Sequence, residues 1–121
     1  YELSDGAALA AAVRDGAKLL LASANLDPYP ELLQRQFTAL AQLRALETGR
    51  WLVSAANTGP SLLIDARGVV RDAIPLGKPA AATFAVPLLN QLTPYDRWGD
   101  APLLLCALGT VVLRYRAGRR V

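Results

Sequence analysis

The C-terminal end of the chain joins a stretch without charges to a cluster of arginines, and this feature limits how the chain can fold. Residues 101–113 contain no charged side chain. Four arginines follow within the last eight residues: Arg114, Arg116, Arg119 and Arg120. Aromatic residues flank the uncharged stretch on both sides: Tyr95, Trp98 and Tyr115. As a helix these 13 residues would be about 20 Å long, shorter than the hydrocarbon core of a bilayer at about 30 Å.

The flanking residues decide how this uncharged stretch is interpreted. Its length alone favours a helix in a protein core or at a membrane surface. Aromatic residues and arginines at the two ends are typical of membrane interfaces, and long basic side chains can reach the headgroups from within the hydrocarbon region. We therefore predict a transmembrane helix over 101–113 and a basic tail over 114–121, with a core helix as the alternative.

Composition excludes several classes of function. The chain of 121 residues is long enough for one domain and carries 13 basic and 10 acidic side chains. Without the four terminal arginines it is nearly neutral, so we expect no nucleic-acid partner, which would need a basic face. The chain has no histidine and one cysteine. This excludes a Ser-His-Asp triad, an internal disulfide and a Cys-rich or His-ligated metal site, and no cofactor is expected.

Helical and strand patterns alternate along residues 1–90. Helices are predicted over 7–13 and 31–48, and strands over 19–22, 51–56, 61–64, 69–74 and 81–86. The residues Asp-Ala-Arg-Gly at 65–68 are typical of a hairpin turn between two of these strands. Because helices and strands follow one another, the pattern indicates an α/β fold rather than an all-helical or all-β one.

The helix over 31–48 carries charged residues on its apolar side. At about 100° per residue, one stripe contains four large apolar residues: Leu33, Phe37, Leu40 and Leu43. Arg44 and Glu47 fall inside this stripe and are three positions apart, a spacing at which side chains on a helix meet. Buried charges are normally paired, so we predict a structural ion pair between Arg44 and Glu47.

Four motifs resemble those of a known family. They are Tyr1-Glu2, the heptapeptide Arg-Ala-Leu-Glu-Thr-Gly-Arg at 44–50, the tetrapeptide Ala-Asn-Thr-Gly at 56–59 with the hairpin at 64–68, and Leu-Thr-Pro-Tyr at 92–95 with Arg-Trp-Gly-Asp at 97–100. In order and spacing the chain resembles the C-terminal part of the apolipoprotein N-acyltransferases, membrane enzymes with a nitrilase-type (carbon–nitrogen hydrolase) domain. The first three motifs also occur in soluble nitrilase relatives, whereas the fourth, joined to an apolar helix, is more specific.

The resemblance implies an organisation for the whole chain. Residues 1–90 would be the C-terminal part of a nitrilase-like αββα sandwich, residues 91–100 a juxtamembrane connector, and 101–113 the transmembrane helix. It also implies an enzyme that takes an acyl group from a phospholipid as a thioester and passes it to the N-terminal cysteine of a diacylated apolipoprotein. Its place would be the bacterial inner membrane, with the catalytic domain on the extracytoplasmic side and the C-terminal tail in the cytoplasm.

The resemblance assigns site residues one by one. The nucleophilic cysteine would precede Tyr1, and the Glu and Lys of the family's triad would lie further upstream, so we expect a fragment that is inactive alone. The amide of Tyr1 would donate to the oxyanion, and Glu2 would support the site. Asn57, Thr58 and Gly59 either line the substrate pocket or only form a turn. The loop over 24–30 departs from the family pattern. In the family this loop lies near the active site, so the resemblance does not establish which acyl chain or acceptor is preferred.

Two other functions stay open at this stage. One is a fragment of a soluble nitrilase-type amidase, in which water replaces the lipoprotein amine. The other is a non-enzymatic module tethered to the membrane. Cys106 lies between Leu105 and Ala107 in the uncharged stretch, where an apolar environment leaves a thiol unreactive, so we interpret it as a small apolar residue.

Overall fold

The computed structural model describes residues 2–75 and 79–119, apart from the side chain of Glu2. The elements, in chain order, are η1 (Glu2–Ser4), α1 (Gly6–Arg14), β1 (Leu20–Ala24), α2 (Glu31–Thr48), β2 (Leu52–Ala56), β3 (Ser61–Ile64), β4 (Val70–Ile74), α3 (Pro94–Trp98) and α4 (Ala101–Gly118). The mixed α/β class predicted from the sequence is confirmed.

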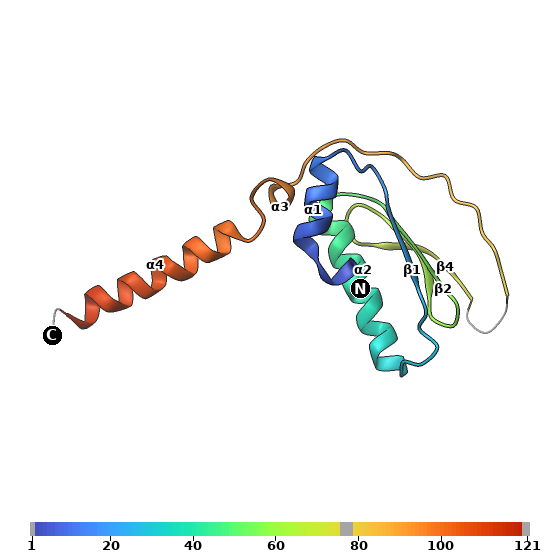
Figure 1. Cartoon of the computed structure of the whole chain (residues 1–121), viewed down its shortest axis with the longest axis horizontal. Coiled ribbons are helices and arrows are strands. Elements are labelled where there is room, and N and C mark those ends of the chain that lie inside the picture. The colour runs from blue at the N-terminus through green and yellow to red at the C-terminus, as the bar shows by residue number, and fades with distance from the viewer. Residues whose placement is uncertain (1, 76–78, 120–121) are drawn as a thin grey trace.

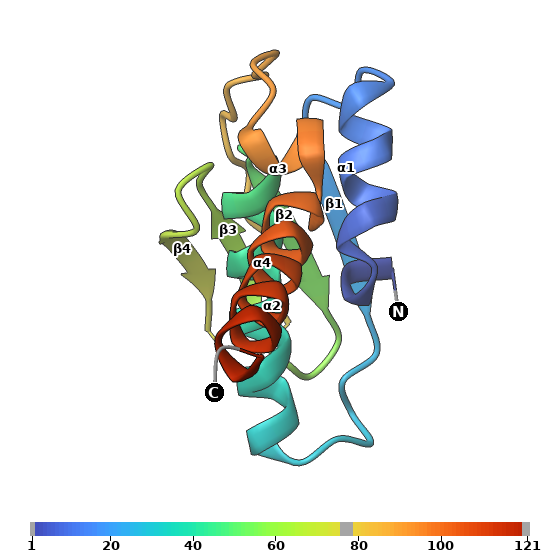
Figure 2. The same ribbon diagram turned by 90° about the vertical axis from the view of Figure 1, so that its left-hand side faces the viewer.

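The four strands form one sheet in the order β1-β2-β3-β4. β1 and β2 are parallel, with Leu20 opposite Leu52 and Ala24 opposite Ala56. Parallel neighbours need a crossover connection, and α2 supplies it. The pairs β2–β3 and β3–β4 are antiparallel. Figures 1 and 2 show α1 and α2 side by side on one face of this sheet.

The core lies between the sheet and the two helices. Alternate strand residues face the helices, as the pleat requires. The buried apolar residues of this core are Leu3, Val13, Leu20, Ala41, Ala45, Leu52, Leu62 and Ile64. α1 starts where the Asp5 side chain accepts a hydrogen bond from the amide of Ala8 at 2.9 Å, which satisfies a free amide of its first turn.

The predicted apolar stripe of α2 is wrong in part. Leu33 is 42% exposed and Leu43 is 43% exposed, whereas Ala41 and Ala45 are fully buried. The helix therefore turns small side chains toward the sheet, because close packing at the centre of the interface leaves no room for leucine. Phe37 and Leu40 pack at the edge of the core as expected.

The predicted strand over 81–86 is also wrong. The residues from 79 to 93 follow an irregular path with no regular secondary structure. Figure 1 shows this segment running apart from the edge of the sheet before it returns to α3. A strand needs a neighbour to bond with, and a short apolar stretch does not specify one by itself. Prolines at 79 and 87, which cannot donate a backbone hydrogen bond, flank the segment.

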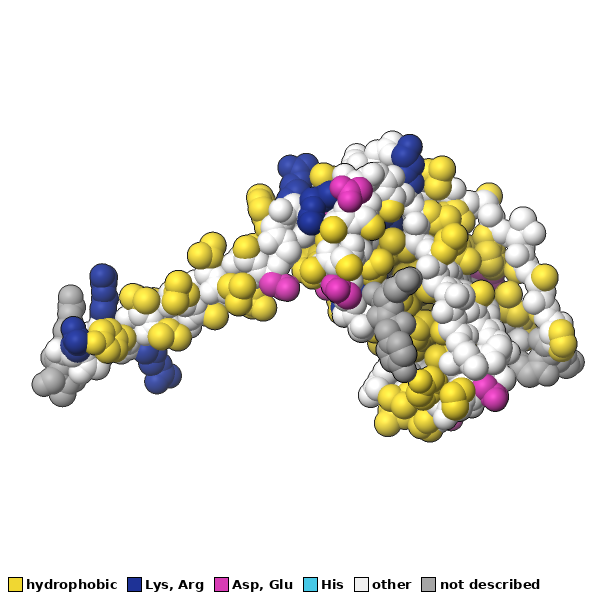
Figure 3. All heavy atoms as spheres, in the orientation of Figure 1, with side chains coloured by type: hydrophobic (Ala, Val, Ile, Leu, Met, Phe, Trp, Pro, Cys, Tyr) yellow, Lys and Arg dark blue, Asp and Glu magenta, His cyan; other side chains and the backbone are white. Residues whose placement is uncertain are grey.

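The C-terminal helix α4 projects away from the body (Figures 1 and 3). It is 18 residues long and continues through Arg114 and Arg116 to Gly118, beyond the uncharged stretch. Its length is therefore about 27 Å, close to the thickness of a hydrocarbon core. Within the described part of the chain it is the one helix long and apolar enough to cross a membrane, with a mean hydropathy of 1.2 and no buried residue.

Candidate functional site

The C-terminal end of α2 holds the segment near the start of the chain. Arg44 Nε donates to the carbonyl oxygen of Leu3 at 2.7 Å, and Arg44 Nη2 donates to the carbonyl oxygen of Ser4 at 3.4 Å. Arg44 Nη1 forms an ion pair with Glu47. The side chains of the pair are 10% and 19% exposed. Arg44 therefore fixes the backbone of η1 while its charge is balanced from the same helix.

α1 approaches this ion pair very closely. A Cβ atom on Gly6 would collide with the guanidinium of Arg44 and would lie 3.0 Å from the hydroxyl of Tyr95. Glycine is therefore the residue that allows α1, α2 and α3 to meet at this point. Burial raises the pKa of the Tyr95 hydroxyl, and the negative charge of Glu47 raises it further. The Tyr95 hydroxyl thus stays protonated near neutral pH.

Arg50 ties the start of β1 to the connector before α3. Its side chain is 1% exposed. Arg50 Nε donates to the carbonyl of Ala17 at 2.9 Å, and Nη1 donates to the carbonyl of Gln91 at 2.7 Å. The carbonyls of Thr48 and Gly49 are further acceptors, at 3.4 Å and 3.3 Å. The structure describes no ion pair for Arg50, so carbonyl dipoles satisfy this buried charge. We call Arg44, Glu47 and Arg50 the α2-end cluster.

The connector reaches the α2-end cluster through Thr93. Its hydroxyl donates to the carbonyl oxygen of Glu47. Thr93 Oγ1 also accepts a hydrogen bond from the amide of Asp96 at 3.0 Å, and the Asp96 carboxylate accepts one from the amide of Thr93 at 2.9 Å, which forms a capping box for α3. Arg14 Nη1 donates to the carbonyl of Asp96 at 2.6 Å. The base of α4 is therefore attached to both α1 and α2.

A second group lies beyond the carboxyl ends of β1 and β2. Asn57 Oδ1 accepts from the amide of Leu26 at 3.0 Å, and Asn57 Nδ2 donates to Asn25 Oδ1 at 2.7 Å. Asn57 Oδ1 also accepts from the amide of Thr58 at 2.9 Å. A Cβ atom on Gly59 would collide with the buried Leu26 side chain. The turn at 57–59 and the loop that starts at Asn25 are thus joined into one surface.

This second group occupies a place where α/β proteins often bind ligands, because the carboxyl ends of parallel strands present their loops together. Asn57 and Thr58 are exposed, and Gly59 is buried. The polar atoms of Asn57 mainly hold the two loops together. Residues 57–59 therefore form a turn, which is one of the two roles that the sequence left open. The predicted role of Asn57, Thr58 and Gly59 in substrate binding stays a prediction.

Three residues singled out in the sequence are not among the two groups described above: Tyr1, Glu2 and Cys106. Tyr1 lies outside the described residues, as does the side chain of Glu2, whose backbone begins η1. The second group and the α2-end cluster lie at opposite ends of β2. Cys106 is exposed on α4. Within residues 2–75 and 79–119, no three His, Cys, Asp or Glu side chains gather as metal ligands would.

The sequence analysis did not predict the contacts that Arg50, Gly6 and Asn25 make with distant parts of the chain. It could have found α3, because Thr93, Pro94 and Asp96 have the spacing of a capping box with proline in the first helical turn. The acceptors of Arg44 and Arg50 are backbone carbonyls, which every residue has, so the sequence carries no signal for them.

Comparison with known proteins shows which proteins the chain is similar to in sequence. No protein-family model matches the chain. The chain is 52% identical over 93% of its length to the apolipoprotein N-acyltransferase of Prochlorococcus marinus strain MIT 9313, and covers 22% of that protein. It is 56% identical over 80% of its length to the apolipoprotein N-acyltransferase of Parasynechococcus marenigrum, covering 21%. With the same-named protein of Bordetella bronchiseptica it shares 38% identity over 88% of its length, covering 20%.

A chain with these matches is related to acyltransferases. Its sequence belongs to the apolipoprotein N-acyltransferase family. The chain spans about one fifth of the length of the curated relatives it matches.

Proposed function

We propose that the chain is a segment of a membrane enzyme that transfers an acyl group from a phospholipid to the N-terminal cysteine of a diacylated apolipoprotein. The observation that carries the proposal is the 52% identity over 93% of the chain to a protein named for N-acylation of apolipoproteins. The α2-end cluster supports it, because it joins the start of the chain to the base of the apolar helix α4.

The proposed fold is the C-terminal part of a nitrilase-like αββα sandwich, with residues 1–90 as part of the catalytic domain. In such a fold a sheet packs helices on one face and a second sheet on the other. Here α1 and α2 cover one face (Figure 2). On the opposite face Leu21 is 73% exposed, and Ala55 is exposed as well. Exposed apolar side chains at these positions are suited to packing against a second sheet.

The proposed chemistry is acyl transfer in two steps. The thiolate of a cysteine immediately before Tyr1 attacks the phospholipid ester, the ester bond breaks to release the lysophospholipid, and a thioester forms. The amine of the apolipoprotein cysteine then attacks the thioester, an amide forms, and the thiol is regenerated. Backbone amides such as that of Tyr1 stabilise the oxyanion in both steps. Glu2 supports the site, while the Glu and Lys of the triad come from upstream.

Arg44 has a positioning role in this proposal. By binding the carbonyls of Leu3 and Ser4 it holds the backbone that follows the proposed nucleophile. Asn57, Thr58 and Gly59 line the substrate pocket from the other end of β2. The loop that they contact, with Asn25 and Leu26, contributes to the preference for acyl chain or acceptor.

The proposed location is the bacterial inner membrane. In this arrangement residues 91–100 form the juxtamembrane connector, 101–113 form the membrane span, and 114–121 face the cytoplasm. An excess of arginines on the cytoplasmic side is the usual determinant of orientation. Since Thr93 and Arg50 attach the connector to the body, the body is held near the outer membrane surface, where phospholipid and lipoprotein substrates reside.

The test uses the full-length parent enzyme with labelled phospholipid and a diacylated lipopeptide acceptor. We expect label on the acceptor amine and a hydroxylamine-sensitive label on the protein, both lost when the cysteine before Tyr1 is replaced by alanine. The isolated 121-residue chain should form no labelled protein, since it lacks the nucleophile. Release of free fatty acid without acceptor acylation would favour a hydrolase. The absence of a cysteine before Tyr1 would favour a non-enzymatic membrane module.

A further inference from the structure

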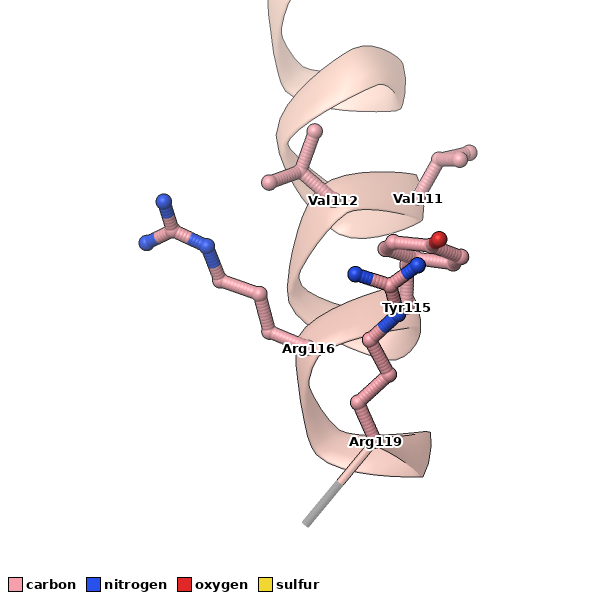
Figure 4. A pocket seen from close by; sticks show the side chains of 5 residues that line it. All are labelled: Val111, Val112, Tyr115, Arg116 and Arg119. Atoms are coloured by element: carbon pink, nitrogen blue, oxygen red, sulfur yellow. The ribbon is translucent and has the colours of Figure 1, made fainter.

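The last turns of α4 carry two arginines and a tyrosine around a shallow, open pocket. The lining residues all come from this one helix: Val111, Val112, Tyr115, Arg116 and Arg119. Figure 4 shows Arg116 on one side, and Arg119 with Tyr115 on the other. The guanidinium carbon of Arg119 lies 4.5 Å from the centre of the Tyr115 ring. This distance allows a cation–π contact, which restrains Arg119.

The two guanidinium groups of this pocket have no carboxylate partner in the part of the chain that the structure describes. The ion pairs there use other arginines: Arg35, Arg44 and Arg71. Both Arg116 and Arg119 are exposed. A guanidinium presents a planar fork of N–H donors that matches two oxygens of a phosphate. Two such groups, three positions apart on α4, line the same pocket from its two sides and provide donors for a phosphate that binds there.

Arg114 provides a reference within the same helix. It carries the same charge but does not line the pocket. At about 100° per residue it lies about 200° around the helix from Arg116, on the opposite side. Loss of Arg114 therefore removes the same charge from the end of α4 without touching the pocket.

The apolar part of α4 sets the depth at which the pocket would lie in a membrane. Its large apolar side chains are exposed around the helix: Leu103, Leu104, Leu105, Leu108, Val111, Val112 and Leu113. A helix that is apolar all round is stable inside a protein core or a bilayer, and α4 has no buried residue in the structure. With this part in the hydrocarbon region, Tyr115, Arg116 and Arg119 lie at the level of the lipid headgroups.

We propose that Tyr115, Arg116 and Arg119 form a binding site for the phosphate of an anionic phospholipid, such as phosphatidylglycerol. This inference rests on the proposed placement of α4 across the membrane. An anionic headgroup fits better than a zwitterionic one, because the two guanidiniums attract the phosphate and repel an ammonium group. Val111 and Val112 form an apolar wall beside the arginines, suited to the first carbons of an acyl chain.

The test reconstitutes the full chain in phosphatidylcholine vesicles and measures its preference for spin-labelled phosphatidylglycerol over spin-labelled phosphatidylcholine. Resistance to alkaline carbonate extraction first establishes insertion. We expect insertion in neutral vesicles and a preference for phosphatidylglycerol. If the chain does not insert, both the inference and the proposed span are wrong. If it inserts and shows no preference, the inference alone is wrong.

Three single variants separate a site from a general charge effect. If the arginines act only through their charge, R114Q, R116Q and R119Q should each lower the preference for phosphatidylglycerol by about the same factor, about fivefold. If Arg116 and Arg119 form a site, R116Q and R119Q should each lower this preference at least about threefold more than R114Q does, because each removes a bidentate donor from the site. Tyr115→Phe should keep the preference, since the ring remains, and Tyr115→Leu should reduce it. Equal losses for the three arginines, or equal effects of Phe and Leu, would overturn the proposal.

Discussion

Arg50 Nη1 donates a 2.7 Å hydrogen bond to the carbonyl oxygen of Gln91, a residue 41 positions away in the sequence. This bond anchors the irregular segment before α3 to the end of α2. The same guanidinium reaches Ala17 at the start of β1, so a single buried side chain holds three distant parts of the fold. The position of α4 relative to the body depends on this contact and on Thr93.

Replacing Arg50 by methionine should destabilise the body of the protein. Methionine keeps much of the volume but leaves the carbonyls of Ala17 and Gln91 without a donor. We expect a loss of about 1–3 kcal/mol in the free energy of unfolding, measured by urea denaturation. The control is Arg35→Gln, which breaks an ion pair exposed at the surface and should cost under about 1 kcal/mol. Equal midpoints for the two variants would contradict this role of Arg50.

Breaking the Arg44–Glu47 ion pair should also destabilise the fold. In Glu47→Gln the guanidinium of Arg44 is left with carbonyl partners only. Removing one partner of a buried pair costs about 3–5 kcal/mol, and the 19% exposure of Glu47 places the expectation near the lower value. Thermal unfolding of Glu47→Gln, Arg44→Met and the double variant measures the coupling. An unchanged melting temperature in Glu47→Gln would show that the pair contributes nothing.

Asp65 should make the stability of the hairpin depend on acid pH. Burial alone would raise its pKa, but amide hydrogen bonds from Val69 and Arg67 and the charge of Arg71 outweigh burial and lower the pKa. Because the folded pKa lies below the unfolded value of 3.8, the carboxylate stabilises the fold above that pH. This stabilisation is lost as the pH falls through the folded pKa.

The measurement for Asp65 compares the wild type with Asp65→Asn from about pH 7 to about pH 2.5. We expect the variant to be less stable near neutral pH by about 1–3 kcal/mol and the difference to shrink in acid. Asp27→Asn, which removes an exposed carboxylate, is the control. A stability difference for Asp65→Asn that does not change with pH would show that its titration is not coupled to folding.

A methyl group at Gly59 should separate the two loops beyond the ends of β1 and β2. Its Cβ would collide with Cδ1 of Leu26 and lie 3.0 Å from the Leu26 Cβ atom. Gly59→Ala should therefore cost about 1–3 kcal/mol and weaken protection of the Leu26 amide from hydrogen exchange. Gly109→Ala is the matched control, because nothing lies within 4 Å of its added Cβ. Normal Leu26 protection in Gly59→Ala would contradict the close approach.

The proposed orientation can be tested with a membrane-impermeant thiol reagent. Cys106 is first replaced by serine, which should leave activity unchanged because the residue is exposed on α4, away from the α2-end cluster. In intact cells with the outer membrane permeabilised, Ala117→Cys should stay unlabelled and Lys18→Cys, on the exposed surface of the body, should react. Labelling at Ala117 from outside would mean that α4 does not span or that its orientation is reversed.

Residues close in the sequence determined the local parts of this fold. The helix at 31–48 ends at Gly49, whose positive φ of 58° suits glycine, and the turn at 65–68 is organised by its own Asp65. The uncharged stretch predicted α4, because apolar composition is a property of the segment itself. The pairing of Arg44 with Glu47 also followed from a spacing of three positions on one helix.

Contacts between distant segments were decided by the tertiary structure. The sequence could not show that α2 turns Ala41 and Ala45 toward the sheet, since the distance between helix and sheet selects small side chains there. It could not show that residues 81–86 lack a partner strand, because pairing depends on what lies beside them. Nor could it select Gln91 and Leu3 as acceptors for Arg50 and Arg44. Every residue offers the same carbonyl group, and only the folded chain decides which one a buried guanidinium meets.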